Sequence, residues 1–338
     1  MEDNRSSRLD EIDVMRGFGI LLVVIGHVWP VGTWIHSFIY SFHMPLFFII
    51  SGLTLSIGKG KPLFTKTDRR LGKEYFLYST LFIVFDIVIR MLAFRTYTKI
   101  DIYVDLLNTV SLFGISVLWF LPTIICARVL ARVVIFYSKR QCFFLLRVCL
   151  LLLIIGIRVP YHEYQTWDAK MLLVLQRILS ASSYVIVGFL IRKYLFTKIK
   201  SLKLFIPAGL INILLADVVN GADFRTLSCG GDVILPFILS ICGTLMIVGV
   251  SSAVTCCRTK LMGYFKYLSS QSLRIMVLHS YLMIPGLIDI ALKKAGISQD
   301  SIIYYSVKTI ALITIVLLIC KFVDRVQKRG SLMLHTSW

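Results

Sequence analysis

The chain has 338 residues, of which 57% are hydrophobic and only 16% are charged, and its formal net charge is +19. A soluble core could not bury this much apolar surface, so the composition excludes an ordinary globular protein and predicts an integral membrane protein that crosses the bilayer many times. The positive charge does not predict a nucleic-acid partner, because its distribution along the chain has a simpler explanation given below.

Ten apolar segments are long enough to cross about 30 Å of hydrocarbon. They run Val14–Pro30, Ile35–Ile57, Leu77–Phe94, Val110–Tyr137, Phe143–Ile157, Met171–Ile191, Leu202–Val219, Val233–Val254, Ser272–Leu292 and Ile302–Val323. The connections between them are short and carry no soluble domain. We therefore expect an all-α bundle of about ten transmembrane helices that forms a single domain over residues 1–338.

Lysine and arginine gather in alternate connections between these segments. The clusters are Arg5, Arg8 and Arg16; Lys59, Lys61, Lys66, Arg69, Arg70 and Lys73; Lys139 and Arg140; Arg192, Lys193, Lys198, Lys200 and Lys203; Arg258, Lys260 and Lys266; and Arg325, Lys328 and Arg329. Cytoplasmic loops of membrane proteins carry such an excess of positive charge. The pattern predicts that both termini are cytoplasmic, and orientation of the helices accounts for most of these residues.

The first segment carries two ionisable residues on one face. Arg16 and His27 are eleven positions apart, which is close to three full turns, so both side chains share a face and His27 lies about 16 Å deeper than Arg16. Ionisable groups in hydrocarbon are costly and usually face a protein interior or a wet cavity. A functional site is the default interpretation, and a hydrogen-bonded packing histidine is the alternative.

The second segment brings another histidine to a similar depth. His43 is followed by Pro45, and proline is tolerated in the first turn of a helix. Because this segment starts at the outer side, His43 and His27 are predicted to face one cavity. The alternative for His43 is a residue at the start of a helix that only bonds the backbone.

At these residues the chain resembles the acyltransferase family 3 membrane proteins, and within them the fucose 4-O-acetylase-like branch. The resemblance rests on Asp13-Val-Met-Arg16-Gly17, on Arg16 with ten residues to His27, and on Phe42-His43-Met44-Pro45-Leu46-Phe47-Phe48 with Ser51-Gly52. Weaker similarities are Arg69-Arg70-Leu71, Leu118-Trp119-Phe120-Leu121, and Ser272-Leu273-Arg274-Ile275 with Leu278-His279. The first third of the chain carries nearly all of the specificity.

The resemblance implies an O-acyltransferase in the cytoplasmic membrane of a bacterium. Its donor would be cytoplasmic acetyl-CoA or another acyl-CoA, and its acceptor a hydroxyl of an envelope or exported carbohydrate. Acyl transfer to a hydroxyl needs a base and exact placement of the two reactants. A neutral imidazole suits the role of base.

Each candidate residue then has an expected role. His27 is the general base, His43 contacts the acceptor or the oxyanion, and Arg16 anchors the same reaction path from the cytoplasmic side. The larger set comprises Arg16, Arg69 and Arg70 as ligands of the donor phosphates, His279 beside the donor tunnel or in a structural role, and Asp13 and Trp119 as supporting residues. Guanidinium groups bind phosphate oxygens in pairs, although Arg69 and Arg70 suit a role in orienting the helices equally well.

Two other classes of protein remain open at this stage. A carrier or flippase for a lipid-linked sugar also needs many helices and a polar interior, but the chain lacks two-half symmetry and intramembrane acidic residues suited to ion coupling. A non-catalytic scaffold leaves the positions of His27 and His43 unexplained. The eight cysteines include no C-x-x-C pair, so no metal site is expected.

Overall fold

The computed structural model describes residues 2–57, 63–92, 99–138, 141–157, 166–197, 202–219, 222–228, 234–257, 260–280, 284–299 and 301–335. These residues are almost entirely helical, and within them the only strand-like pairing is an isolated bridge between Asp223 and Ser228. The helices are α1 (Glu2–Val28), α2 (Trp34–Tyr40), α3 (His43–Leu53), α4 (Lys66–Leu92), α5 (Lys99–Val110), η1 (Ser116–Trp119), α6 (Phe120–Tyr137), α7 (Cys142–Ile157), α8 (Trp167–Thr197), α9 (Leu202–Leu215), η2 (Ala216–Val219), α10 (Ile234–Cys256), α11 (Lys260–Ser270), α12 (Ser272–Leu278), α13 (Ile284–Lys294) and α14 (Ile302–His335). The all-α class predicted from the sequence is confirmed.

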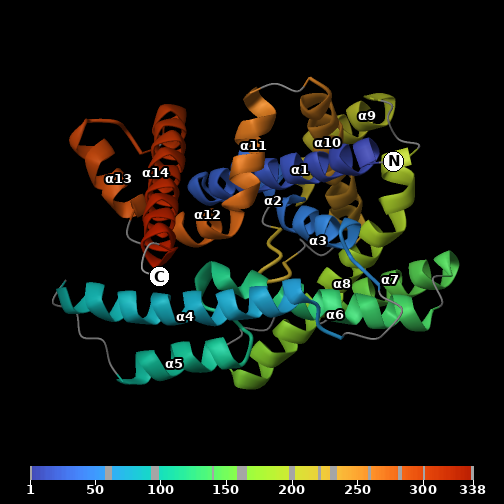
Figure 1. Cartoon of the computed structure of the whole chain (residues 1–338), viewed down its shortest axis with the longest axis horizontal. Helices are drawn as coiled ribbons and strands as arrows, with labels where there is room; N and C mark the ends of the chain where they lie inside the picture. The colour runs from blue at the N-terminus through green and yellow to red at the C-terminus, as the bar shows by residue number, and fades with distance from the viewer. Residues whose placement is uncertain are drawn as a thin grey trace.

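The helices fall into two groups that α3 joins. Helix α1 runs across one half of the molecule and packs against α10, α11, α12 and α14, whereas α4 to α7 occupy the other half and α8 extends from that half toward the first (Figure 1). Helix α3 packs against both α1 and α8. The part of the second predicted segment that begins at His43, which is α3, therefore lies between the two halves of the molecule.

Small residues allow α3 and α8 to cross at close range. A Cβ atom on Gly52 would clash with the carbonyl oxygen of Val185, and one on Gly188 would clash with that of Ile49. Close backbone contact through small residues is the usual way in which helices associate in a membrane, where lipid removes the hydrophobic driving force. Gly52, part of the Ser51-Gly52 pair noted in the sequence, thus fixes the position of α3.

Five helical stretches of the described residues are long and apolar enough to cross a membrane. They are Trp34–Leu53, Ser116–Tyr137, Trp167–Arg192, Ile234–Cys256 and Ile302–Gln327. Helix α14 also exposes a row of large apolar side chains, including Ile303, Ile310 and Leu318, which suits contact with lipid. The fold is consistent with an integral membrane protein, while the count of ten spans and the cytoplasmic termini stay predictions.

Three of the predicted segments are interrupted in the structure by a break between two helices. The segment Ile35–Ile57 is divided between α2 and α3, and Ser272–Leu292 is divided between α12 and α13. In the segment Val110–Tyr137, Val110 ends α5, and Gly114 has a φ of 82°, which breaks the helix before η1. A hydropathy profile does not reveal such breaks, because it averages over a window and the residues on both sides of each break are apolar.

Helix α11 was not predicted from the sequence. Because it packs along α1, it places the residues of α12 further along α1 than the sequence analysis expected. It lies along α1, with the rings of Phe18 and Phe265 stacked 3.8 Å apart. Gly17 makes this contact possible, because a Cβ atom there would clash with the backbone of Phe265. The chain has therefore already risen beside α1 before α12 begins, and α12 continues along α1 toward His27.

Candidate functional site

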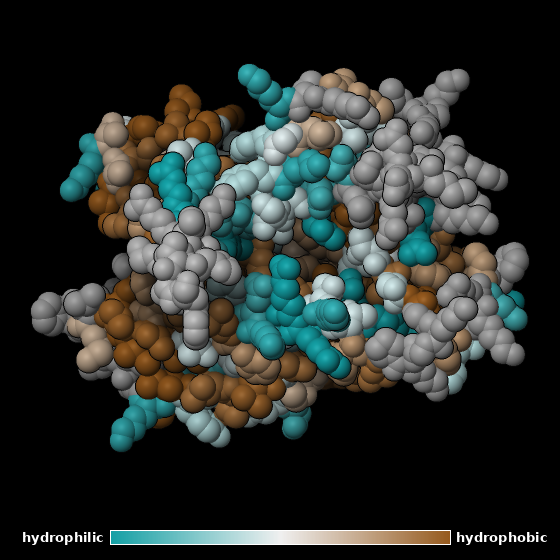
Figure 2. Space-filling model, in the orientation of Figure 1, coloured by the Kyte–Doolittle hydropathy of each residue, from teal (hydrophilic) through white to brown (hydrophobic). Residues whose placement is uncertain are grey.

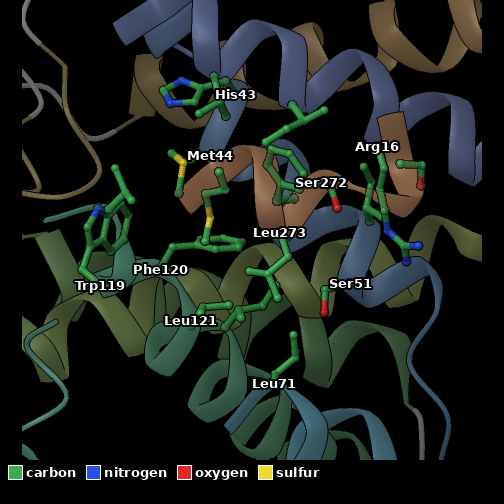
Figure 3. A pocket seen from close by; sticks show the side chains of 18 of the residues that line it. Arg16, His43, Met44, Ser51, Leu71, Trp119, Phe120, Leu121, Ser272 and Leu273 are labelled. Carbon is green, nitrogen blue, oxygen red and sulfur yellow. The ribbon is translucent and has the colours of Figure 1, made fainter. Parts of the chain in front are cut away.

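One cavity of about 740 Å³ lies among α1, α3, α6, α12 and the start of α4. Figure 2 shows a recess at the centre of one face with hydrophilic residues around it, and Figure 3 shows side chains that line the cavity. We call the end at Arg16 the inner end and the end at His27 the outer end, after the predicted topology. The lining between these ends is largely apolar and includes Ile20, Val23, Met44, Phe47, Phe120, Leu121, Leu273 and Met276.

Helix α1 carries one polar residue to each end of this cavity. It is continuous from Glu2 to Val28, and both Arg16 and His27 line the cavity. The shared face predicted from their spacing is therefore confirmed. The His27 side chain is exposed in the cavity, so its ring is accessible to a ligand.

At the inner end, Asp13 lies where it can orient Arg16. An Nη atom of Arg16 is 3.4 Å from the Asp13 carboxylate, which also accepts a hydrogen bond of 3.1 Å from the Ser269 hydroxyl. The Arg16 side chain remains 35% exposed. Asp13 and Arg16 also line the cavity together, so the guanidinium is held near the cavity while part of it stays open to a ligand.

The structure separates the two adjacent arginines of α4. Arg70 lines the inner end and pairs with Glu74 at 3.0 Å, with its own side chain 77% exposed. Arg69 is exposed and does not line the cavity. Neighbouring residues of a helix point about 100° apart, so only Arg70 of the pair lines the cavity.

A buried ion-pair cluster close to the inner end was missed by the sequence analysis. The Asp68 side chain is fully buried and accepts hydrogen bonds from Arg128 Nε at 2.7 Å and from Arg132. Arg128 also donates a hydrogen bond of 2.8 Å to the Ser51 hydroxyl and lines the cavity. Two guanidinium groups thus share one carboxylate, which leaves a surplus of positive charge beside the cavity.

Asp68 stays ionised although it is buried, at the start of α4 and before the predicted span. Burial by itself raises the pKa of this carboxyl, but hydrogen bonds from Thr65 and Arg128 outweigh burial and hold the pKa below its ordinary value. Such bonds favour the charged form. The cluster therefore remains an ion-pair network at neutral pH.

Four of the six histidines of the chain gather around the outer end. The His27 ring lies 5.0 Å from that of His279 and 6.1 Å from that of Tyr40, measured between centroids. Tyr40 in turn lies 4.7 Å from His43 and stacks on His36 at 3.9 Å. His27 and His43 line the same cavity, as predicted. His36 and Tyr40, four residues apart on one helix face, had not been singled out.

Backbone carbonyls fix the tautomers of two of these rings. Nδ1 of His43 is 2.9 Å from the Ile39 oxygen, and Nδ1 of His279 is 3.1 Å from the Ile275 oxygen. A carbonyl oxygen only accepts, so in the neutral ring Nδ1 carries the proton and Nε2 is an acceptor. Nε2 of His279 is buried, and among the described residues it has no hydrogen-bond partner.

The structure corrects the predicted position of His279. It was expected in the inner half of a long ninth helix, either beside the donor tunnel or in a structural role, but it follows α12 directly and lies against His27 at the outer end. The reason is α11, which lifts the chain along α1 before α12 starts. His279 is buried and does not line the cavity.

The loop 222–228 lies at the outer end of the cavity. Asp223 and Arg225 of this loop line the cavity together with Trp119. Burial raises the pKa of the Asp223 carboxyl, which lies outside the helices. Neither loop residue was singled out from the sequence, because a short polar connection between apolar segments carries no pattern that predicts its depth.

Six aromatic and polar residues of the predicted outer connections could stack on or hydrogen-bond a saccharide, or could equally form an interfacial aromatic belt. Those that the structure describes do not line the cavity. Trp29 packs on Tyr305, while Trp34 packs on Phe38 and donates a hydrogen bond of 3.1 Å to the Ile213 oxygen. The remaining members are Trp167, which lies beneath Lys170, and Tyr161, His162 and Glu163, which lie outside the described residues.

Within the described part of the chain, no group of three or more His, Cys, Asp or Glu residues is arranged to hold a metal ion. At the outer end, the rings of His27, His36 and His43 pack around Tyr40, and the His279 ring lies beside that of His27.

The residues that the sequence analysis missed differ in whether a sequence pattern could have indicated them. Arg128 and Arg132 lie four positions apart within an apolar segment, so the argument used for Arg16 and His27 applies to them as well. Their partner Asp68 lies on another helix, and no spacing rule connects it with them. Lys266, which lines the inner end and pairs with Asp10 at 2.6 Å, reaches the cavity only because α11 packs on α1.

Fold and cavity together define an all-helical membrane protein with a polar site at each end of one internal cavity. The chain belongs to the acyltransferase family 3, whose model, described as an acyltransferase domain, matches residues 9–321. Among curated proteins and among solved structures, no match is found. Family membership makes the protein a membrane acyltransferase by class, and the match covers both ends of the cavity.

Proposed function

We propose that the protein transfers an acyl group, most simply acetyl, from cytoplasmic acyl-CoA to a hydroxyl of an envelope or exported carbohydrate. The observation that carries this proposal is the single cavity that contains Arg16 at its inner end and His27 at its outer end. The two residues are about 16 Å apart along α1. An elongated donor with a charged head and a reactive tip suits such a cavity.

The inner end would hold the phosphates of the donor. Arg16, Arg70 and Arg128 line it together with Lys266, whereas Asp13 is the only acidic residue among the described lining residues at this end. Guanidinium groups bind phosphate oxygens through paired, charge-assisted hydrogen bonds. The apolar middle of the cavity would surround the less polar arm, so the thioester would reach the outer end.

The chemistry at the outer end would need one base. His27 takes the proton of the acceptor hydroxyl while its oxygen attacks the thioester carbonyl; the C–O bond forms and the C–S bond breaks. The proton then passes from His27 to the departing CoA sulfur. General base catalysis of this kind contributes about 100-fold to 10,000-fold to a rate.

Two neighbouring histidines would support His27 in different ways. His279 presents a buried acceptor nitrogen beside His27, so an N–H of His27 can point to it and leave the other nitrogen free as the base. His279 is then a positioning residue for the base and not a ligand of the donor. The nitrogen of His43 that Ile39 does not use is also an acceptor, which suits the acceptor hydroxyl better than an oxyanion.

The test is acetyl-CoA consumption by the purified protein in lipid nanodiscs with envelope polysaccharide, followed through release of free CoA thiol and the mass of the product. We expect His27→Ala to lower transfer by about 100-fold to 10,000-fold and to keep acetyl-CoA binding. The matched control is His36→Phe, which keeps a ring against Tyr40 and does not touch the cavity. Normal transfer by His27→Ala would refute the base assignment, and a wild-type protein that consumes no acyl-CoA would refute the acyltransferase proposal and leave the carrier for a lipid-linked sugar as the alternative.

A further inference from the structure

The loop 222–228 is folded tightly and dips into the bundle between η2 and α10. Asp223 and Ser228 exchange two backbone hydrogen bonds of 3.0 and 3.2 Å, and the Asp223 carboxylate accepts a third bond of 2.8 Å from the Arg225 backbone. Leu227 has a φ of 55°. A non-glycine residue rarely adopts this left-handed conformation, and it persists only where the surroundings enforce it.

Two side chains, Phe224 and Arg177, hold this loop in position. The Phe224 ring packs at 5.0 Å from Phe48 and stacks at 6.2 Å on Trp119. Arg177, whose residue exposure is 2%, donates a hydrogen bond of 2.6 Å to the Arg225 carbonyl and lies 5.1 Å from the Trp119 ring. A buried guanidinium is costly unless its donors are satisfied, so the loop and the bundle depend on each other here.

The loop therefore presents two charged side chains of opposite sign at the outer end. Asp223 and Arg225 both line the cavity close to Tyr40 and His27. Among the described residues, neither side chain forms an ion pair. A carboxylate accepts hydrogen bonds and a guanidinium donates them.

This arrangement differs in charge from the inner end. The inner end has a surplus of positive charge, which suits phosphates, whereas the loop lines the outer end with one acceptor group and one donor group of opposite charge. A ligand with a net charge would be attracted by one member of the pair and repelled by the other, so the pair offers it no net electrostatic gain. A compound with several hydroxyls can donate to one group and accept from the other.

We propose that Asp223 and Arg225 bind the acceptor, that this acceptor is a neutral polyhydroxylated compound of the saccharide class, and that the loop holds one of its hydroxyls against His27. This inference rests on the function proposed above and adds the residues that choose the acceptor. Phe224 and Arg177 fix the loop, and Trp119 forms the neighbouring wall of the cavity.

The experiment measures acetyl transfer from acetyl-CoA to three methyl glycosides of equal size: a glucoside, a glucuronide and a glucosaminide. Wild-type protein should prefer the neutral glucoside. Asp223→Asn and Arg225→Gln should each raise the apparent KM for the glucoside by about 10-fold to 100-fold, the worth of one hydrogen bond to a charged group. The KM for acetyl-CoA should not change.

The ratio of the KM values for charged and neutral glycosides distinguishes acceptor binding from a merely structural role, because a structural defect would not change this ratio. Asp223→Asn should lower the KM for the glucuronide relative to that for the glucoside, because the carboxylate that repels the anion is gone. Arg225→Gln should lower the KM for the glucosaminide in the same way, because the guanidinium that repels the cation is gone. The matched control is Asp217→Asn, which removes an exposed carboxylate of η2 that does not line the cavity and should leave all three KM values unchanged.

Three sets of outcomes separate this inference from the function on which it rests. A wild-type protein that consumes no acetyl-CoA with envelope polysaccharide refutes both. A wild-type protein that consumes acetyl-CoA, but uses none of the glycosides or uses the glucuronide at least as well as the glucoside, overturns the neutral acceptor. Unchanged glycoside KM values in both variants, or equal changes in Asp217→Asn, overturn the assignment to the loop.

Discussion

Replacing Asp68 by asparagine should destabilise the protein strongly, although the change removes almost no volume. The carboxylate is fully buried and accepts hydrogen bonds from Arg128 at 2.7 Å, from Arg132, and from the Thr65 backbone and hydroxyl at 2.8 and 2.7 Å. Asparagine leaves two buried guanidinium groups without a counter-charge. Removing one partner of a buried ion pair costs about 3 to 5 kcal/mol, and we expect a loss near the lower end because the amide oxygen keeps some of the bonds.

The assay is equilibrium unfolding in mixed micelles with increasing denaturing detergent. The control is Glu74→Gln on the same helix, which removes the pairing with the exposed Arg70 and should cost less than about 1 kcal/mol. Adding Arg132→Met to Asp68→Asn should recover part of the loss, since one unpaired charge disappears. A free energy of unfolding for Asp68→Asn within about 1 kcal/mol of the wild type would refute the reasoning.

Four further outcomes follow from the same geometry. His279→Leu should lower the kcat of transfer at least 10-fold with little change in the KM for acetyl-CoA, whereas His279→Gln, which keeps an acceptor near the His27 ring, should recover most of it; equal rates in both variants would contradict the positioning role. Arg16→Gln should weaken acetyl-CoA binding measured by calorimetry and Arg69→Gln should not, because Arg16 lines the cavity and Arg69 does not. A reporter active only in the cytoplasm should work when fused to the C-terminus and fail when fused after Arg225, and silence at the well-expressed C-terminal fusion would exclude the ten-helix topology. Acidification should remove the stabilisation by the Asp68 cluster only as the pH falls through the lowered pKa of this carboxyl, below its ordinary 3.8, so a midpoint that drops between pH 7 and 5 would have to come from other groups.

The residues on the first helical segment could be predicted because one continuous helix relates them. Arg16 and His27 needed only the helical repeat to be placed on one face, and the structure confirms that both line one cavity. His43 was predicted at the same depth because Pro45 marks the start of its helix. These predictions succeed where a local rule of backbone geometry fixes the relation between side chains.

Other predictions failed where the relation between residues passes through space. Arg69 and Arg70 look equivalent in the sequence, but the orientation of α4 turns only Arg70 to the cavity. His279 was expected near the inner end, and the packing of α11 on α1 brings it to His27 instead. A hydropathy profile cannot detect either effect, because it averages over a window and contains no information on which helices are neighbours.

The sequence by itself determined the class of the protein: its apolar content requires a membrane, its apolar segments require helices, and its helical spacing sets Arg16 and His27 on one face. Tertiary structure alone decided which side chains from distant segments share the cavity. The Asp68 cluster, the His27 and His279 pair, and the placement of Asp223 and Arg225 join residues from separate parts of the chain. The physical reason is that lipid satisfies every apolar surface equally, so the choice of helix neighbours depends on close packing at residues such as Gly17, Gly52 and Gly188, and that packing exists only in the folded bundle.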